Sequence, residues 1–337
     1  MINQQWHLVS RPTGEPTPSN FKLVEATVPD LQDGQVLVRN HYMSLDPYMR
    51  GRMNDGKSYA QPQPLNAVMQ GGTVGEVVAS KNAAFQAGDK VVAPGGWQQY
   101  FLAEAAQLPM MRKVDASQVP LSAYLGAVGM PGVTAWVGLV TIIEPKAGET
   151  IVVSAASGAV GAVVGQLAKA RGCRAVGLAG GPDKCKAVVD EFGFDACIDY
   201  RQYPDLKSLS AALKEACPQG IDGYFENVGG ITLDAVLQRA NAFSRVAMCG
   251  MIAGYNGEPI PLQAPQLILI NRMKVQGFIV SEHMQHWPAA LAELGQGIAT
   301  GKYKHRETIA NGLAAAPEAF MGLLKGKNFG KQLVKLV

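Results

Sequence analysis

A pair of glycines that follows an apolar run could hold a phosphate group. Residues 151–154, Ile-Val-Val-Ser, are typical of a buried strand, and they lead into Ala156-x-Gly158-x-x-Gly161 and a stretch with apolar residues on one helical face. Gly158 would let the backbone approach a pyrophosphate, Gly161 would let the helix sit close on the sheet, and the helix start would offer N–H groups to the anion. Ala156 replaces the first glycine of the usual fingerprint, and a plain strand-to-helix turn is the alternative interpretation. We favour dinucleotide binding, because the motif opens the first of several strand–helix–strand units.

The end of the second predicted strand indicates which dinucleotide is bound. An NAD-dependent enzyme usually carries an acidic residue there for the ribose hydroxyls, whereas this chain has Gly180 and Gly181. Pro182 suits the first position of a helix, so Lys184 falls in the first helical turn. A cation at a helix N-terminus opposes the macrodipole unless an anion, such as the 2′-phosphate of NADPH, also lies there. The pattern therefore predicts NADPH rather than NADH; the alternative is an ordinary solvated Lys184, with Asp183 favouring the helix start.

Neither a metal site nor a nucleophilic triad is visible among the remaining reactive side chains. The five histidines are His7, His41, His283, His286 and His305. His283 and His286 lie three apart, but only the adjacent Glu282 accompanies them, so a surface or helix-start pair is the better interpretation. The five cysteines are odd in number and none forms a C-x-x-C pair, which argues against a disulfide framework and a zinc knuckle. We therefore expect no metal, and chemistry that depends on a cofactor and a few hydrogen-bond donors.

From about residue 148 the chain alternates apolar strands with helices. The predicted strands are Thr150–Ser154, Arg174–Leu178, Ala196–Asp199, Gly223–Glu226, Arg245–Cys249 and Lys274–Val280. The helices between them are predicted near residues 159–170, 182–191, 206–216, 232–240 and 264–271. Such alternation indicates right-handed crossovers and a parallel sheet. Six strands are what a doubly wound dinucleotide-binding sheet requires, and its ligands bind outside the carboxyl ends of the strands.

The first 125 residues or so show a different pattern of apolar and polar residues. Short alternating runs are punctuated by Pro and Gly, which predicts a β-rich, barrel-like unit. The last segment ends in the strand-like Lys331–Val337 and is expected to fold back onto this unit. The chain is thus expected to be of the α/β class, with a β-rich domain over residues 1–127, completed by 303–337, and a dinucleotide-binding domain over 128–302.

Composition excludes several classes of protein. The net charge is +3 and the basic residues are scattered, so there is no electrostatic footprint for nucleic acid. The opening residues lack the charged start and apolar run of a signal peptide, and the longest apolar stretch, residues 151–167, is interrupted by glycines and serines. We expect a soluble, cytoplasmic enzyme with free thiols and no membrane partner.

Several motifs, in the same order along nearly the whole chain, resemble the zinc-independent medium-chain dehydrogenase/reductase superfamily, in its prostaglandin and leukotriene reductase branch. The motifs occupy residues 44–50, 129–135, 155–165, 224–230, 249–256 and 323–331. The stretch Asp46–Met53 is especially similar to bacterial NADPH-dependent curcumin reductases. Zinc-dependent members carry a Gly-His-Glu motif where this chain has Gln70–Gly75, without ligands. The resemblance implies a GroES-like barrel domain followed by a Rossmann domain.

The resemblance also implies which residues hold NADPH. They are Gly158, Ala159, Val160 and Gly161 at the pyrophosphate, Lys184 and Tyr200 at the 2′-phosphate, and Asn227, Cys249, Gly250, Tyr255, Phe278, Ile279, Val280 and Asn328 elsewhere on the cofactor. For Asn328 a turn residue is the alternative. A homodimer is expected from the family, with the predicted edge strand Lys274–Val280 as its seam.

The implied reaction reduces a carbon–carbon double bond conjugated to a carbonyl, in a small hydrophobic enone or enal such as a 2-alkenal, a 2-alkenone or a curcumin-like compound. Hydride reaches the β-carbon, and the negative charge that builds on the carbonyl oxygen needs a hydrogen-bond donor. Tyr255 is the first candidate donor, with a packing role as the alternative; Tyr48 and Tyr59 are weaker candidates. The side chains expected to supply an apolar wall for the substrate are Met49, Met53, Trp97 and Met130.

Two other functions stay open at this level. An NADPH:quinone oxidoreductase of the same superfamily would use the same hydride with a different acceptor. A cofactor-binding protein without catalysis would bind NADPH tightly and turn over no enone, aldehyde or quinone.

Overall fold

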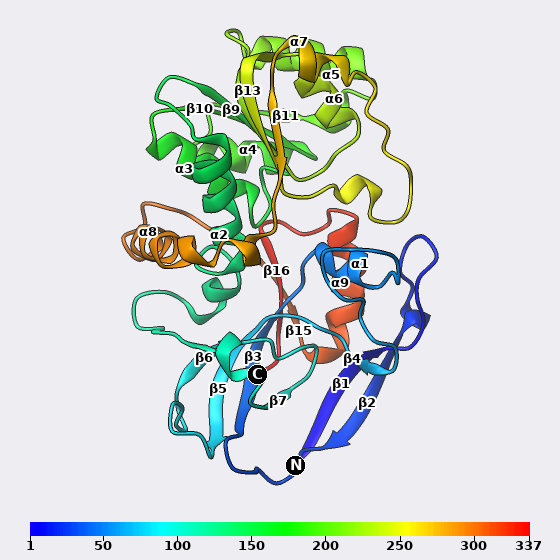
Figure 1. The fold of residues 1–337 in the computed structure, drawn as a ribbon, viewed down its shortest axis with the longest axis vertical. Helices are drawn as coiled ribbons and strands as arrows, with labels where there is room; N and C mark the ends of the chain where they lie inside the picture. The colour runs from blue at the N-terminus through cyan, green and yellow to red at the C-terminus, as the bar shows by residue number, and fades with distance from the viewer. The chain divides into compact units, whose positions relative to one another are not determined.

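The computed structural model describes residues 1–337, which form two compact units (Figure 1). The first unit comprises Met1–Leu125 together with Glu307–Val337, and the second comprises Gly126–Arg306. No helix combines the length and apolar character that a membrane crossing demands.

The first unit is built from two sheets. A seven-stranded mixed sheet has the order β15-β16-β3-β5-β6-β8, with β7 also paired to β3. Its strands are β3 (Val36–Ser44), β5 (Thr73–Ser80), β6 (Lys90–Ala93), β7 (Tyr100–Ala103), β8 (Arg112–Lys113), β15 (Glu307–Asn311) and β16 (Lys331–Lys335). The smaller sheet, β2-β1-β4, contains β1 (Ile2–Leu8), β2 (Phe21–Thr27) and β4 (Ala67–Val68). The predicted C-terminal strand therefore returns to this unit, where β16 runs antiparallel to β3.

Apolar side chains from distant parts of the chain fill the first unit. The Trp97 ring stacks on Phe21 with centroids 5.7 Å apart, and Phe320 of α9 (Ala316–Leu324) packs edge-on against Trp97 at 5.6 Å. Met49 of the short helix α1 (Tyr48–Arg52) belongs to the same cluster. Because α9 contributes to this core, the C-terminal segment is part of the unit's packing as well as of its sheet.

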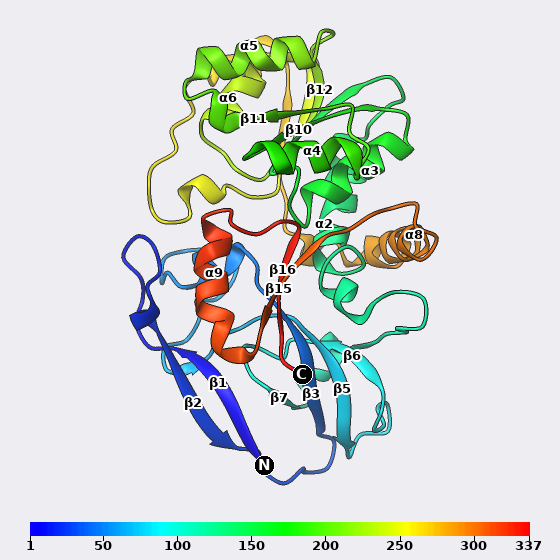
Figure 2. The same ribbon diagram turned by 180° about the vertical axis from the view of Figure 1, so that it is seen from behind.

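The second unit is a doubly wound parallel sheet, as predicted. Its strand order is β11-β10-β9-β12-β13-β14, and every neighbouring pair is parallel. The strands are β9 (Thr150–Ser154), β10 (Arg174–Ala179), β11 (Ala196–Asp199), β12 (Ile221–Glu226), β13 (Ala240–Met248) and β14 (Lys274–Gly277). The helices are α2 (Met130–Val137), α3 (Gly161–Ala170), α4 (Pro182–Asp190), α5 (Leu206–Ala216), α6 (Ile231–Leu237), α7 (Gln266–Ile270) and α8 (Trp287–Ala299). Helices cover both faces of the sheet (Figure 2), with α5 and α6 packed together on one of them.

The sixth strand is shorter than predicted. β14 ends at Gly277, so Phe278, Ile279 and Val280 do not continue it. The Phe278 ring turns into the unit and packs edge-on against Phe225, with centroids 6.2 Å apart. The N–H of Glu282 donates to the Ile279 carbonyl at 2.9 Å and closes a short 3₁₀ turn. A buried aromatic followed by a tight turn ends the ladder, which the apolar run in the sequence could not reveal.

Candidate cofactor and active site

The predicted phosphate loop joins β9 to α3, and its backbone is tightly packed at the start of the helix. A Cβ added at Gly161 would lie 2.4 Å from the Ala155 carbonyl oxygen, so only glycine fits at this helix start. Ala155 itself adopts a left-handed conformation with φ of 49°, a strained backbone for a residue with a side chain. No side chain caps α3. The backbone N–H groups of Ala159 and Val160 come directly before α3, at this uncapped helix start, which is the arrangement that binds a pyrophosphate in such sheets.

The end of β10 is closed over by two side chains from the segment after β11. A Cβ at Gly180 would lie 2.9 Å from both the Tyr200 hydroxyl and the Arg201 Nε. Gly181 has φ of 103° and donates its N–H to the Asp199 carboxylate at 2.8 Å. The two glycines that replace the usual acidic residue therefore make room for Tyr200 and Arg201, and they hold the turn into α4.

Positive charge gathers beside these glycines. Burial and the neighbouring Arg201 guanidinium lower the pKa of Lys184, which lies in the first turn of α4 as predicted. The Arg201 guanidinium lies next to the Tyr200 hydroxyl, since both are 2.9 Å from the position that a Gly180 Cβ would take. Two cations and a phenol that crowd one helix start are a suitable setting for a phosphate dianion. The sequence reasoning missed Arg201; its signal was a second cation directly after Tyr200 at the end of the third strand.

Asn227 is held at the carboxyl end of the neighbouring strand. Its side-chain Nδ2 donates to the Ser154 carbonyl at 2.8 Å, and its backbone N–H donates to the Ser154 hydroxyl at 2.8 Å. The Asn227 carbonyl accepts from the Ile252 N–H at 3.3 Å. The structure thus brings the phosphate loop, Asn227 and the loop after β13 to one edge of the sheet, where doubly wound folds bind their ligands.

Tyr255 follows the 3₁₀ turn Ile252–Gly254 and is half-buried. Its hydroxyl lies over Gly250, where an added Cβ would be 3.0 Å from the oxygen. The Met251 N–H donates to this oxygen at 3.4 Å. A phenol that accepts one hydrogen bond can still donate another, and this is the capacity that an oxyanion donor requires. In the same loop, burial raises the pKa of the Cys249 thiol to about 12, which disfavours the reactive thiolate.

The remaining residues predicted to bind the cofactor make hydrogen bonds within their own segments of the chain. The carbonyls of Ile279 and Val280 accept hydrogen bonds within their own segment, from Glu282 N–H and Trp287 Nε1. Asn328 lies in the first unit, where its Nδ2 donates to the Gly330 carbonyl at 2.7 Å. This bond is the one expected of a turn residue. A cofactor contact by Asn328 or by residues 278–280 remains a prediction.

Tyr48 and Tyr59, the weaker candidates for the hydrogen-bond donor, both lie in the first unit and differ in burial. Burial and the nearby Asp46 carboxylate raise the pKa of Tyr48, and the Arg52 guanidinium lies 4.6 Å from the centre of its ring. Tyr59 is exposed.

The prediction that four side chains form an apolar wall for the substrate is wrong for three of them. The Met49, Met53 and Trp97 side chains are at most 2% exposed, because they fill the core around Phe21 and Phe320 and not an open surface. Met130, at the start of α2, is half-buried.

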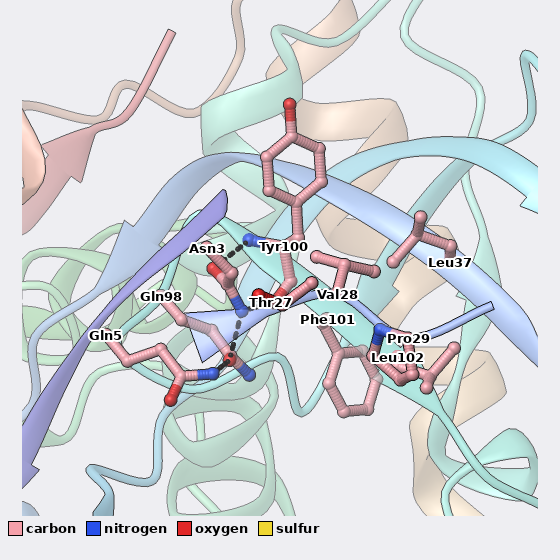
Figure 3. Close-up of a pocket in the computed structure, with 10 residues that line it drawn as sticks. All are labelled: Asn3, Gln5, Thr27, Val28, Pro29, Leu37, Gln98, Tyr100, Phe101 and Leu102. Carbon is pink, nitrogen blue, oxygen red and sulfur yellow. Dashed lines mark hydrogen bonds between the residues drawn. The ribbon is translucent and has the colours of Figure 1, made fainter. Parts of the chain in front are cut away.

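A pocket of about 250 Å³ lies within the first unit, between β1, the end of β2 and β7 (Figure 3). Its polar groups are already paired: the Gln98 Oε1 accepts from Asn3 at 3.0 Å and from Gln5 at 2.8 Å, and the Gln98 Nε2 donates to the Gly95 carbonyl. Tyr100 is its one titratable lining residue, and none of the lining residues is among those predicted to hold the cofactor or the substrate. The pocket is therefore no part of the candidate site.

The residues present do not fit a zinc ion. No group of three or more His, Cys, Asp or Glu side chains is placed to hold a metal. The predicted helix-start pair, His283 and His286, stacks ring on ring with centroids 6.1 Å apart, and Trp136 lies 5.9 Å from the second ring. Rings packed in this way are not arranged as a tetrahedral ligand set.

Exhaustive treatment with a chelator is therefore expected to leave turnover unchanged, because no step needs a metal ligand. The measurement is NADPH oxidation before and after treatment, with metal content determined in parallel. A stoichiometric metal lost together with activity would contradict this.

Family models match both units. Residues 4–111 match a model described as the N-terminal domain of oxidoreductase, and residues 159–296 match one described as zinc-binding dehydrogenase. The second match spans most of the parallel-sheet unit.

The chain is similar over nearly its whole length to known reductases and to a solved structure. The chain is 45% identical to NADPH-dependent curcumin reductase of Escherichia coli, over 99% of this chain and 97% of that protein. It is 40% identical to prostaglandin reductase 1 of Bos taurus, over 98% of each. It is 41% identical to 2-alkenal reductase (NADP(+)-dependent) of Nicotiana tabacum, over 98% and 97%. The crystal structure of CurA in complex with NADPH from Vibrio vulnificus superposes with a TM-score of 0.91 at 44% identity, covering 99% of both chains.

Proposed function

The chain belongs to the medium-chain dehydrogenase/reductase superfamily, in the family that includes curcumin reductase and prostaglandin reductase 1, and on that premise we propose that it reduces the double bond of α,β-unsaturated carbonyl compounds with NADPH. The substrate class is that of 2-alkenals, 2-alkenones and curcumin-like enones. The likeness to relatives extends over 97% or more of each chain, so it includes both units.

The observation that carries the proposal is the set of loops at the carboxyl edge of the parallel sheet. The tight β9–α3 turn fits a pyrophosphate, and the Lys184, Tyr200 and Arg201 cluster fits a 2′-phosphate. Bound NADPH would supply the hydride that reaches the β-carbon of the enone. The chain itself contributes the groups that bind NADPH, the Asn227 side chain that orients the cofactor, and a hydrogen-bond donor for the substrate.

Tyr255 is the donor in this proposal. Its hydroxyl lies at the end of β13, in the loop that also contacts Asn227. As negative charge builds on the substrate carbonyl oxygen, a phenol O–H held at that point stabilises the enolate and can then deliver the α-carbon proton.

A panel of acceptors tests this function. NADPH oxidation is followed with 2-alkenals, 2-alkenones, curcumin and simple quinones, and the saturated carbonyl product is identified by mass spectrometry. Enones and enals should be turned over with NADPH and give the saturated ketone or aldehyde. Fast turnover of quinones with none of enones would favour a quinone oxidoreductase. Tight NADPH binding without any turnover would favour a binding protein.

We also propose that the protein is a homodimer joined along β14. This strand forms the edge of the parallel sheet, and Val275 on it is 40% exposed. Leu269 and Ile270 of the preceding helix α7 are 79% and 56% exposed, which leaves apolar surface beside unpaired backbone groups. Pairing β14 with its symmetry mate would cover both.

Sedimentation at micromolar concentration should therefore give a dimer. Replacing Val275 with lysine should shift it towards monomer, because a charge would be buried at the seam. A wild-type monomer at that concentration would refute the idea.

A further inference from the structure

A buried carboxyl group sits directly behind the candidate site. Glu226, the last residue of β12, has 0% exposure and forms no salt bridge. Its Oε1 accepts from the Ser154 hydroxyl at 2.9 Å and from the Val228 N–H at 2.6 Å. Its Oε2 accepts from the Tyr224 hydroxyl at 3.0 Å. A buried acid without a cation is costly unless such donors surround it, so its position calls for an explanation.

The Ser154 hydroxyl links this carboxyl group to Asn227. The Ser154 hydroxyl lies 3.3 Å from the Phe225 carbonyl oxygen and 2.9 Å from the Glu226 Oε1, so its hydrogen goes to the nearer acceptor, Glu226. A lone pair of the same oxygen is then turned towards the Asn227 N–H, which donates to it at 2.8 Å. The Asn227 Nδ2 is fixed on the Ser154 carbonyl. The amide is therefore held with its Oδ1 as the remaining acceptor for a ligand.

The backbone of Glu226 holds a second part of the site. Its carbonyl accepts from the N–H groups of Cys249 and Gly250 at 2.9 and 3.1 Å. The next carbonyl but one, that of Val228, accepts from Ala253 at 3.0 Å. The loop that carries Tyr255 is thus anchored on the same short segment as Asn227.

The order of the strands indicates which half of the cofactor would lie near the segment Glu226–Val228. The cationic cluster lies at the end of β10 and the phosphate loop at the end of β9, so a dinucleotide that runs along the edge places its nicotinamide half over β12 and β13. We propose that Glu226 is a positioning residue for the nicotinamide half of NADPH: through Ser154 and Val228 it fixes the Asn227 amide and the Tyr255 loop without touching the cofactor itself. This inference rests on the NADPH binding proposed above.

Three variants separate this role from general stability. In Glu226→Leu the Ser154, Val228 and Tyr224 donors lose their acceptor. In Glu226→Gln the Oε1 can still accept from Ser154 and Val228, while the new Nε2 can donate to the Tyr224 oxygen. Asp222→Asn is the matched control, because Asp222 also joins β12 to β9, through the Thr150 N–H at 2.9 Å, but at the opposite end of the sheet.

Equilibrium binding of two probes gives the readout. NADPH spans the whole site, and adenosine 2′,5′-bisphosphate carries the 2′-phosphate but no nicotinamide. Glu226→Leu should weaken NADPH binding by about tenfold or more, while the bisphosphate binds as in the wild type. Glu226→Gln should bind NADPH to within about threefold of the wild type. Asp222→Asn should leave both affinities unchanged, whatever it does to the thermal midpoint.

Two results would overturn the proposal. One is a folded Glu226→Leu protein that binds NADPH as tightly as the wild type. The other is an equal loss for both probes, or the same loss in Asp222→Asn, since either would mean a purely structural role. If Glu226→Leu does not fold, Ser154→Ala replaces it, with a loss for NADPH and none for the bisphosphate expected. The binding measurements need no enone, so failure of enone reduction would leave them intact and the two proposals can fail separately.

Discussion

Replacing Tyr255 with phenylalanine is expected to lower kcat for an enone by a factor of about 10²–10³, because one donor to a developing oxyanion is commonly worth that much. The ring remains and only the hydroxyl is lost, so the affinity for NADPH should barely change. The structure places this hydroxyl over Gly250 at the end of β13, with Met251 N–H donating to it. Steady-state kinetics with a 2-alkenone, together with a fluorescence titration of NADPH, checks both parts.

Tyr303→Phe is a suitable control for this substitution. Tyr303 is buried in the same unit and donates its hydroxyl to Glu293 at 3.1 Å. Its loss can cost stability but should leave kcat unchanged. A drop below about tenfold for Tyr255→Phe would mean that cofactor hydroxyls or water do most of the stabilising. A large rise in the NADPH dissociation constant would instead make Tyr255 a packing residue of the cofactor loop.

Replacing Lys184 with alanine is expected to weaken NADPH binding by about tenfold to a hundredfold, because a charge-assisted contact to phosphate is worth about 1.5–3 kcal/mol. NADH lacks the 2′-phosphate, so its affinity should change little. The ratio of kcat/KM for the two cofactors measures the effect directly. Equal losses for NADPH and NADH would refute the assignment.

Two further variants refine this test. Lys186→Ala, on the same helix, removes a lysine that pairs with Asp190 on the exposed side, and it should leave cofactor preference unchanged. Arg201→Ala should shift the preference in the same direction as Lys184→Ala, because its guanidinium lies next to Lys184 and Tyr200. If Arg201→Ala had no effect, the 2′-phosphate would have to be held by Lys184 and Tyr200 alone.

The sequence predicted those features that depend on neighbouring residues. The strand and turn at residues 150–161 are local, so the phosphate loop and the parallel sheet could be predicted, and the structure confirms both β9 and α3. The position of Lys184 followed from Pro182 at the helix start. The family resemblance was carried by short motifs, and full-length relatives confirm it.

Features that depend on packing between distant residues could not be predicted. Apolar residues such as Met49 and Trp97 look alike in a sequence whether they line a cleft or fill a core, and here they are core. The end of β14 depends on a contact between the Phe278 and Phe225 rings across the sheet. Nothing in the sequence distinguishes Glu226 from the other acidic residues, and only the fold shows that it is buried behind Asn227.

The most direct test of the proposed reaction follows the hydride itself. NADPH carrying two deuterium atoms at the nicotinamide C4 is used to reduce a 2-alkenone, and the position of deuterium in the product is read by NMR and mass spectrometry. One deuterium on the β-carbon of the saturated ketone is the predicted result, with an α-carbon hydrogen of solvent origin, because the Tyr255 hydroxyl that delivers it exchanges with water. Deuterium on the carbonyl carbon of an allylic alcohol, or a product without deuterium, would contradict the proposed reaction.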